Sequence, residues 1–178
     1  MNRHYTIEAY AQKLDQGRRA LPDLAITSDV IVGFPGETDD HFRSTHDFVK
    51  TQAFAELHVF PYSKRTGTPA ARFVDEVPED VKHARVERLI RLSQQLQRDY
   101  NLRFAGQTLE VIPEEAETRD GQTWLTGHAD NYMKIEFPGG EGWLGEVCAV
   151  RVEAPGIELS SGRLEAVLSR VDMTALLG

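Results

Sequence analysis

Residues 27–38 read TSDVIVGFPGET, an apolar run of strand type that ends in a turn rich in glycine and proline. Thr38, directly after this turn, is a good helix N-cap, so the residues predict a strand, a tight turn and a helix. Ligands of α/β proteins bind at such carboxyl ends of parallel strands, and glycines let the backbone approach them closely. The turn therefore predicts a cradle for a polar or anionic small molecule, with a ligand-free βα turn as the alternative.

The flanking segments continue the α/β pattern. Apolar residues at helical spacing predict helices over 6–22 and 78–104, and residues 54–60 read as a second strand. Two strands are too few for a parallel sheet, which needs both faces covered and is seldom this narrow. Residues 1–105 are therefore predicted to be the tail of a larger α/β array.

The hydrophobic period changes at Gly106. Four short runs of strand character follow, separated by glycine and proline turn signals: 108–112, 123–127, 133–137 and 147–152. Several short strands in about seventy residues are typical of a small barrel. Residues 106–178 are therefore predicted to form a closed or partly closed β-barrel, with Trp124 and Phe137 in its core.

The chain has a net charge of −8, which is confined to its second part. Residues 1–105 hold 15 basic and 15 acidic side chains, whereas residues 106–178 hold 5 and 13. Phosphate binding needs clustered lysine and arginine, so the second part is not expected to bind nucleic acid through its overall charge. No apolar run approaches the ~20 residues of a membrane span. The single cysteine excludes an internal disulfide and favours a cytoplasmic location.

Residues 60–70, FPYSKRTGTPA, follow the second predicted strand and offer an aromatic ring, hydroxyls and two adjacent cations. Such a loop suits an adenine ring or a nucleic-acid backbone, and an ordinary polar loop is the alternative. Further candidate RNA contacts are the arginines opposite the apolar stripe of the long helix and two side chains of the barrel: Arg88, Arg91, Arg98, Tyr132 and Lys134.

No metal ligand or catalytic residue is assigned from the sequence. The six histidines lack metal-ligand spacing, and Cys148 in a strand-like run is expected to be a small buried hydrophobe. Asp29 lies inside the apolar run, where an unpaired carboxylate is costly. It is expected to anchor the loop by accepting backbone hydrogen bonds, and a carboxylate that faces a ligand site is the alternative.

Several ordered motifs resemble the radical-SAM tRNA methylthiotransferases. Residues 27–38 are similar to the family's tDiIvGFPGET segment, and residues 58–70, HVFPYSKRTGTPA, to its hvFpYSkRpGTpA segment. In this full form the second segment resembles the branch that acts on threonylcarbamoyl-adenosine. Residues 127–132, GHADNY, resemble the signature of the TRAM domain that ends these enzymes, and residues 1–6 fit the family's mid-barrel MnRxYt.

The resemblance covers essentially the whole chain and implies a fold that is α/β plus all-β. Residues 1–105 would be the C-terminal part of a radical-SAM partial (β/α) barrel. Residues 106–178 would be a TRAM-type, RNA-binding β-barrel. The implied reaction adds a methylthio group at C2 of a modified adenosine next to the anticodon, using S-adenosylmethionine (SAM) and [4Fe-4S] clusters, so the implied partner is the anticodon stem-loop of tRNA.

The resemblance also implies site residues. Positions that match the family's SAM-binding segments are Arg3, Gly33, Phe34, Glu37, Phe60, Tyr62 and Ser63. The combined candidates for RNA binding are Lys64, Arg65, Arg88, Arg91, Tyr132 and Lys134.

The cysteines mark a departure from the family pattern. The Cys-x-x-x-Cys-x-x-Cys motif is absent, and [4Fe-4S] clusters need such thiolates. The chain alone is therefore expected to be inactive and to supply only part of a SAM pocket, completed by a missing N-terminal half or a partner chain. An unpaired sheet edge also favours a homodimer. The alternatives are a non-catalytic RNA-binding accessory protein and an unrelated α/β phosphate-binding enzyme that uses residues 33–38.

Overall fold

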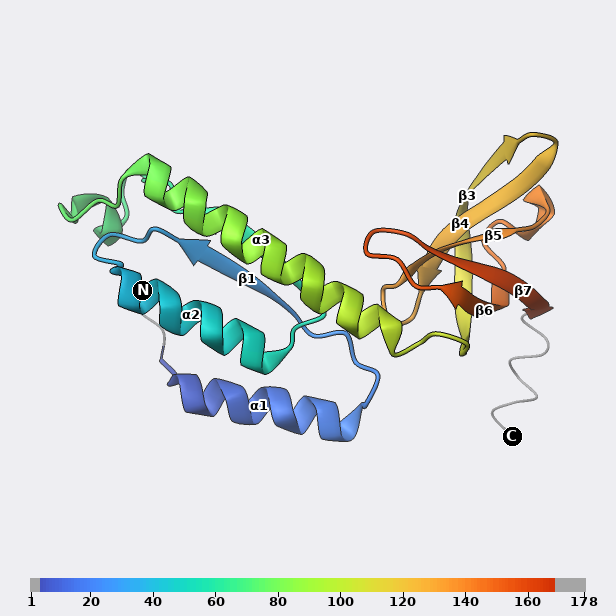
Figure 1. Ribbon diagram of the computed structural model, residues 1–178, viewed down its shortest axis with the longest axis horizontal. Helices are drawn as coiled ribbons and strands as arrows, with labels where there is room; N and C mark the ends of the chain where they lie inside the picture. The colour runs from blue at the N-terminus through green and yellow to red at the C-terminus, as the bar shows by residue number, and fades with distance from the viewer. Residues whose placement is uncertain (1–3, 169–178) are drawn as a thin grey trace. The chain divides into compact units, whose positions relative to one another are not determined.

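The computed structural model describes residues 4–168. Contacts divide the chain after Gln97 into two compact units, so helix α3 (Glu79–Leu102) contributes to both. The first unit is an α/β layer and the second is a closed β-barrel (Figure 1). No helix in the described part of the chain has the length and apolar character needed to cross a membrane.

The first unit has the predicted order of helix, strand, helix, strand, helix. Its elements before α3 are α1 (Ile7–Ala20), β1 (Thr27–Val32), α2 (Asp39–Gln52), β2 (Glu56–Pro61) and the short 3₁₀ helix η1 (Pro69–Arg72). The two strands pair in parallel, from Thr27 beside Glu56 to Val32 beside Pro61. The parallel strand pair expected from the sequence is thus confirmed.

Two threonines begin the first two helices, as the sequence predicts. The Thr6 hydroxyl accepts a hydrogen bond from the backbone N–H of Ala9 at 3.2 Å, and the Thr38 hydroxyl accepts one from His41 at 3.2 Å. The His41 side chain returns the bond by accepting from the backbone N–H of Thr38 at 3.3 Å. This reciprocal capping box starts α2 immediately after the glycine-rich turn.

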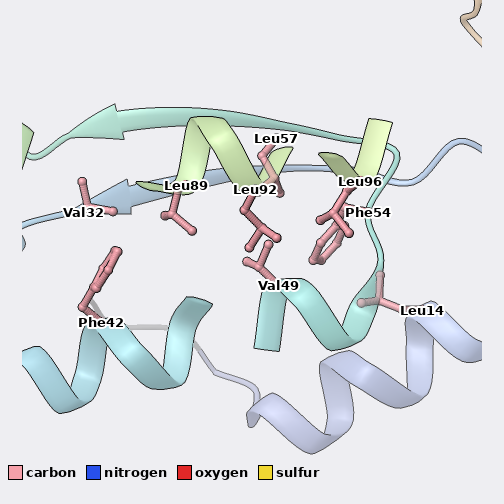
Figure 2. Packing of buried hydrophobic residues seen from close by; sticks show 9 residues of the cluster. All are labelled: Leu14, Val32, Phe42, Val49, Phe54, Leu57, Leu89, Leu92 and Leu96. Atoms are coloured by element: carbon pink, nitrogen blue, oxygen red, sulfur yellow. The ribbon is translucent and has the colours of Figure 1, made fainter. Parts of the chain in front are cut away.

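The helices cover one face of the two strands with an apolar core. Figure 2 shows side chains from the three helices, the two strands and the link between α2 and β2 meeting in one cluster: Leu14, Val32, Phe42, Val49, Phe54, Leu57, Leu89, Leu92 and Leu96. Burying each such side chain contributes about 1.5–3 kcal/mol. Alternate residues of both strands point into this cluster, so the remaining residues lie on the opposite face.

That opposite face of the sheet is open. Ile31 and Phe60 are neighbours across the strands and remain 39% and 51% exposed, and Asp29 and His58 form the pair before them. The anchoring role expected for Asp29 is wrong: its side chain is exposed, and no hydrogen bond to it is found among the described residues. The period-2 geometry of the strand explains this, because Asp29 shares a face with Ile31 and not with Val30.

The second unit is a closed barrel of five strands, in yellow to red in Figure 1. In chain order these are β3 (Thr108–Arg119), β4 (Gln122–Ala129), β5 (Lys134–Pro138), β6 (Val147–Ala154) and β7 (Ser160–Leu168), with the 3₁₀ helix η2 (Glu141–Trp143) before β6. Their order around the barrel is β3-β4-β5-β7-β6. Only β5 and β7 pair in parallel; the other neighbours are antiparallel.

The barrel interior is filled by apolar side chains from every strand except β7, whose inward Gly162 fits where a larger residue would clash. Phe137 is fully buried, as predicted. Trp124 is not in the core: it is half-buried, and the guanidinium of Arg119 lies 5.3 Å from its ring centre. An indole beside a β-hairpin end can stack against a cation and keep its polar edge hydrated.

Candidate functional site

A cleft of about 630 Å³ lies on the open face of the first unit, toward the carboxyl ends of β1 and β2. Its floor is apolar and includes Ile31 and Phe60. Polar residues line it as well: Asp29 on β1, and Ser63 and Arg65 in the loop after β2. An apolar floor with a few polar groups is the usual lining of a small-molecule site.

Aromatic rings form one side of this cleft. Phe34 from the turn after β1 meets Tyr62 edge-on, with ring centres 5.2 Å apart, and Phe73 at 6.1 Å. The Tyr62 hydroxyl is buried and has no hydrogen-bond partner among the described residues. A buried hydroxyl normally finds a partner, so this one is a polar group left unsatisfied beside the cleft.

A buried arginine of α3 fixes the turn between β1 and α2. The Arg85 guanidinium donates to a carboxylate oxygen of Glu37 at 2.7 Å and to one of Asp39 at 2.7 Å. The other Glu37 oxygen accepts from the backbone N–H of Gly33 at 3.1 Å. Glu37 thus bonds within the turn and does not line the cleft.

A buried lysine of α3 fills the space beside Gly33. Gly33 has φ +73°, and a Cβ added there would lie 2.3 Å from Cγ of Lys82. The Lys82 ammonium donates to Glu79 at 2.6 Å and approaches the backbone carbonyl of Tyr62 at 3.5 Å. A side chain of this protein therefore occupies the close approach to Gly33 that the sequence suggested for a ligand.

Lys82 and Arg85 are site residues that the sequence analysis missed. The sequence does contain a pattern that includes them. They occupy the same face of α3, at the same spacing of three and four residues, as the buried Leu89, Leu92 and Leu96. Charged residues normally lie on the solvent face of a helix. Lys82 and Arg85 can therefore be assigned to the buried face only when the carboxylates that pair with them are known.

The two cations predicted in the loop after β2 have different surroundings. The Lys64 ammonium bonds the carboxylate of Glu76 at 2.7 Å on the surface, whereas Arg65 lines the cleft. This hydrogen bond, helped by the charge of the partner, raises the pKa of Lys64 and lowers the pKa of Glu76 from their ordinary values. Lys64 therefore ties the two ends of the loop together, and Arg65 faces the space where a ligand would lie.

The predicted RNA contacts on α3, Arg88 and Arg91, are exposed, and each contacts another side chain of this unit. The Arg88 guanidinium lies 5.0 Å from the ring centre of Phe42, and Arg91 pairs with Glu87 at 3.7 Å, one turn earlier. Exposed pairs of this kind are weak and do not hold the side chains firmly. Both arginines thus remain accessible on the helix surface, outside the cleft.

The predicted RNA contacts on the barrel lie at the turn between β4 and β5. Tyr132 adopts φ +64° and is 81% exposed, while the Asn131 side chain accepts a hydrogen bond from the backbone N–H of Met133 at 3.1 Å. Lys134 follows on β5, in register with His128 of β4. The turn therefore presents an aromatic ring to solvent, with a cation two residues away.

Known proteins resemble this chain over almost all of its length. It is 49% identical over 170 residues, 94% of this chain and 38% of the relative, to the threonylcarbamoyladenosine tRNA methylthiotransferase MtaB of Bacillus subtilis (strain 168). The chain belongs to the radical-SAM tRNA methylthiotransferase family. Two tRNA-2-methylthio-N(6)-dimethylallyladenosine synthases also match: one from Thermoanaerobacter sp. (strain X514), 38% identical over 94% of this chain and 36% of the relative, and one from Maricaulis maris (strain MCS10), 41% identical over 92% and 36%. No protein-family model matches.

The chain spans little more than a third of the length of these methylthiotransferases. Members of the family use SAM and iron–sulfur clusters. Of the positions that resemble the family's SAM site, Phe34, Phe60, Tyr62 and Ser63 line one cleft together, while Gly33 and Glu37 lie in the turn behind it. Arg3 lies outside the described residues.

The residues of this chain do not fit an iron–sulfur cluster. Within residues 4–168, no three histidine, cysteine or acidic side chains group together as metal ligands. Cys148 is fully buried in the barrel, where burial and, less strongly, the charge of Glu146 raise the pKa of its thiol. A protonated, enclosed thiol is a poor iron ligand.

Within the described residues of the barrel, three arginines are paired with acidic side chains. Arg151 lies 3.7 Å from Glu165, Arg163 lies 3.4 Å from Glu153, and Arg119 pairs with both Glu117 and Glu136. Like the pair of Arg91 on α3, these exposed pairs are weak, but each places a carboxylate beside the guanidinium and so reduces its attraction for a phosphate. Among the candidate barrel contacts, Tyr132 and Lys134 are thus the best placed for RNA.

Proposed function

We propose that this chain is the C-terminal portion of a tRNA methylthiotransferase, with one side of the SAM site over residues 1–105 and an RNA-binding, TRAM-type barrel over 106–178. The cleft carries the proposal, because the two family-like segments, 27–38 and 58–70, line it together. The substrate would be a modified adenosine beside the anticodon, threonylcarbamoyl-adenosine by the similarity to MtaB.

The cleft has the chemistry that SAM requires. Ile31 and Phe60 offer apolar contact to an adenine ring, and the buried Tyr62 hydroxyl has a free hydrogen-bonding capacity. Asp29 and Arg65 place opposite charges on the rim, which suits a zwitterionic ligand. When bound, SAM supplies the radical chemistry and the methyl group; these side chains bind it, orient it and exclude water.

The barrel is the proposed docking surface for the tRNA. Tyr132 can stack on an unpaired base, and such stacking is worth about 1–3 kcal/mol per base. Lys134 adds a cation at the same turn. Arg88 and Arg91 on α3 are separate candidate contacts, which belong to the first unit. The clusters that the reaction needs would be held by residues outside this chain, supplied by an N-terminal half or a partner polypeptide. The free edges of the β1–β2 sheet would be covered by that segment or by a second copy.

The first test is binding of SAM to the purified chain by equilibrium dialysis. We expect saturable binding that is weakened at least about tenfold by Phe60→Ala, which removes the apolar floor, and unchanged by Ile112→Ala on the barrel surface. Absence of SAM binding together with binding of an anticodon stem-loop would overturn the cofactor role and favour the RNA-binding accessory protein.

The second test is anaerobic reconstitution with iron and sulfide. We expect no stoichiometric cluster, because one buried cysteine cannot supply the thiolates. Adding the N-terminal portion of a full-length relative as a separate polypeptide should allow a cluster to form. A cluster spectrum from this chain alone would contradict the proposal.

A further inference from the structure

We propose that Arg85 and Lys82 are positioning residues, which hold the ends of β1 and β2 in the arrangement that the cleft requires. Neither residue lines the cleft, and both lie on one side of α3 with side chains only 6% and 7% exposed. The inference rests on the proposed function only in taking this cleft as the SAM site.

Arg85 acts on the end of β1 through Glu37. Its guanidinium bonds the Glu37 carboxylate and also donates to the Glu37 backbone carbonyl at 3.2 Å. The second Glu37 oxygen accepts from the N–H of Gly33, the residue before Phe34. Two hydrogen-bonded steps therefore connect Arg85 to the aromatic side of the cleft.

Lys82 acts on both strand ends at once. Its aliphatic stem lies against Gly33 after β1, and its ammonium approaches the carbonyl of Tyr62 after β2 and lies 5.9 Å from the centre of the Tyr62 ring. Lys82 therefore contacts Tyr62 and the residue before Phe34, and the rings of Phe34 and Tyr62 contact each other.

A role in stability alone does not explain this arrangement. Desolvating charged groups is costly, and apolar residues of similar size often stabilise a fold equally well. The Arg85 guanidinium also lies 5.4 Å from the ring centre of Phe42, a contact that an apolar side chain could replace. What an apolar pair would lack is the directional bonding of a planar, forked guanidinium to two carboxylates.

The test uses the 178-residue chain labelled with 3-fluorotyrosine, which places a fluorine probe on each of five tyrosines. The Tyr62 resonance is assigned from its loss in Tyr62→Phe. We expect Arg85→Met to shift the Tyr62 resonance, to leave Tyr132 in the barrel unchanged, and to weaken SAM binding about tenfold. Lys82→Met keeps most of the stem and should give a smaller shift of the same resonance.

The matched control is Arg43→Met, which removes an exposed ion pair with Asp40 at 2.8 Å and should change neither signal. Wild-type values of both the Tyr62 resonance and SAM affinity in folded Arg85→Met overturn the proposal. A purely stabilising role would lower the melting temperature and leave the Tyr62 resonance of the folded protein in place.

The proposal can still be tested if Arg85→Met does not fold or if the wild-type chain does not bind SAM. If Arg85→Met does not fold, Arg85→Lys keeps the charge but not the fork, and an unshifted Tyr62 in that variant overturns the proposal. If the wild-type chain does not bind SAM, the proposed function fails, while a shifted Tyr62 in Arg85→Met still supports the positioning role.

Discussion

The two units of this protein bury different kinds of side chain. Among the described residues, the buried charged side chains are Lys82 and Arg85, both in the α/β unit and both bonded to a turn or loop beside the cleft. The barrel buries apolar side chains and a few neutral polar ones, and its arginines pair with glutamates on the surface. The barrel is therefore a closed apolar core, whereas the α/β unit uses two buried charged side chains to hold the turn and loop beside its cleft.

The largest effect is expected in the barrel core. Leu125→Ala removes a fully buried side chain and should lower the unfolding free energy of the barrel by about 3 kcal/mol. Both tryptophans, Trp124 and Trp143, lie in the barrel, so their fluorescence reports its unfolding, while circular dichroism at 222 nm reports mainly the helices. We expect the fluorescence midpoint in urea to fall much further than the helical midpoint. Equal shifts of both signals would show that the two units unfold together and would remove the contrast.

A smaller effect on stability is expected in the turn between β1 and α2, where Gly33→Ala is compared with its matched control Gly36→Ala. Both glycines have positive φ, which costs another residue about 1–2 kcal/mol, but only at Gly33 does the new Cβ meet Lys82. Gly33→Ala should therefore destabilise the α/β unit by about 2 kcal/mol more than Gly36→Ala in urea unfolding. The double variant Gly33→Ala with Lys82→Ala should recover part of that difference. Equal losses in the two single variants would mean that Lys82 moves aside freely.

The next effect concerns the caps. Thr38→Ala removes the hydroxyl that caps α2 beside the cleft and should cost about 1 kcal/mol. Thr6→Ala removes the equivalent bond at α1, which buries only Leu14 by contrast with Phe42 and Val49 in α2. Thermal melting at 222 nm should therefore show the larger loss for Thr38→Ala. A larger loss for Thr6→Ala would mean that α1 contributes more to the unit than its burial suggests.

Much of the fold was predictable because the patterns that specify its helices and strands lie within short stretches of the sequence. The caps at Thr6 and Thr38, the apolar strands and the period of α3 each depend on neighbouring residues. Strand β7 was not among the predicted runs: residues 160–168 begin with two serines and a glycine, and its parallel pairing with β5 joins residues far apart in the chain. A pairing between strands so far apart in the chain cannot be recognised from the residues of one strand alone.

The candidate site was predictable in part. The motif residues Phe34, Phe60, Tyr62 and Ser63 were assigned to one ligand, and they do share a cleft. The residues that hold them were not found, because Arg85 acts across more than forty positions of the chain on Glu37. Asp29 was misassigned because an apolar neighbourhood in sequence does not say which face of a strand a residue occupies.

The smallest effect is expected at the exposed pair of Lys64 and Glu76, which contrasts with the buried pair at Arg85. Because the pKa of Glu76 is lowered in the folded protein, the loop tether is present above the ordinary glutamate pKa and is lost as the pH falls through the lowered value. Because the pKa of Lys64 is raised, the tether persists through the ordinary lysine pKa and is lost as the pH rises through the raised value. An NMR titration of the Glu76 carboxyl should give a pKa that rises toward the ordinary value in Lys64→Met and in high salt, since exposed pairs are screened. An unchanged Glu76 titration in Lys64→Met would mean that the surface pair does not persist in solution. The loop after β2 would then be held by its other contacts, among them those of Lys82 with Tyr62 and of Gly36 with Asp75.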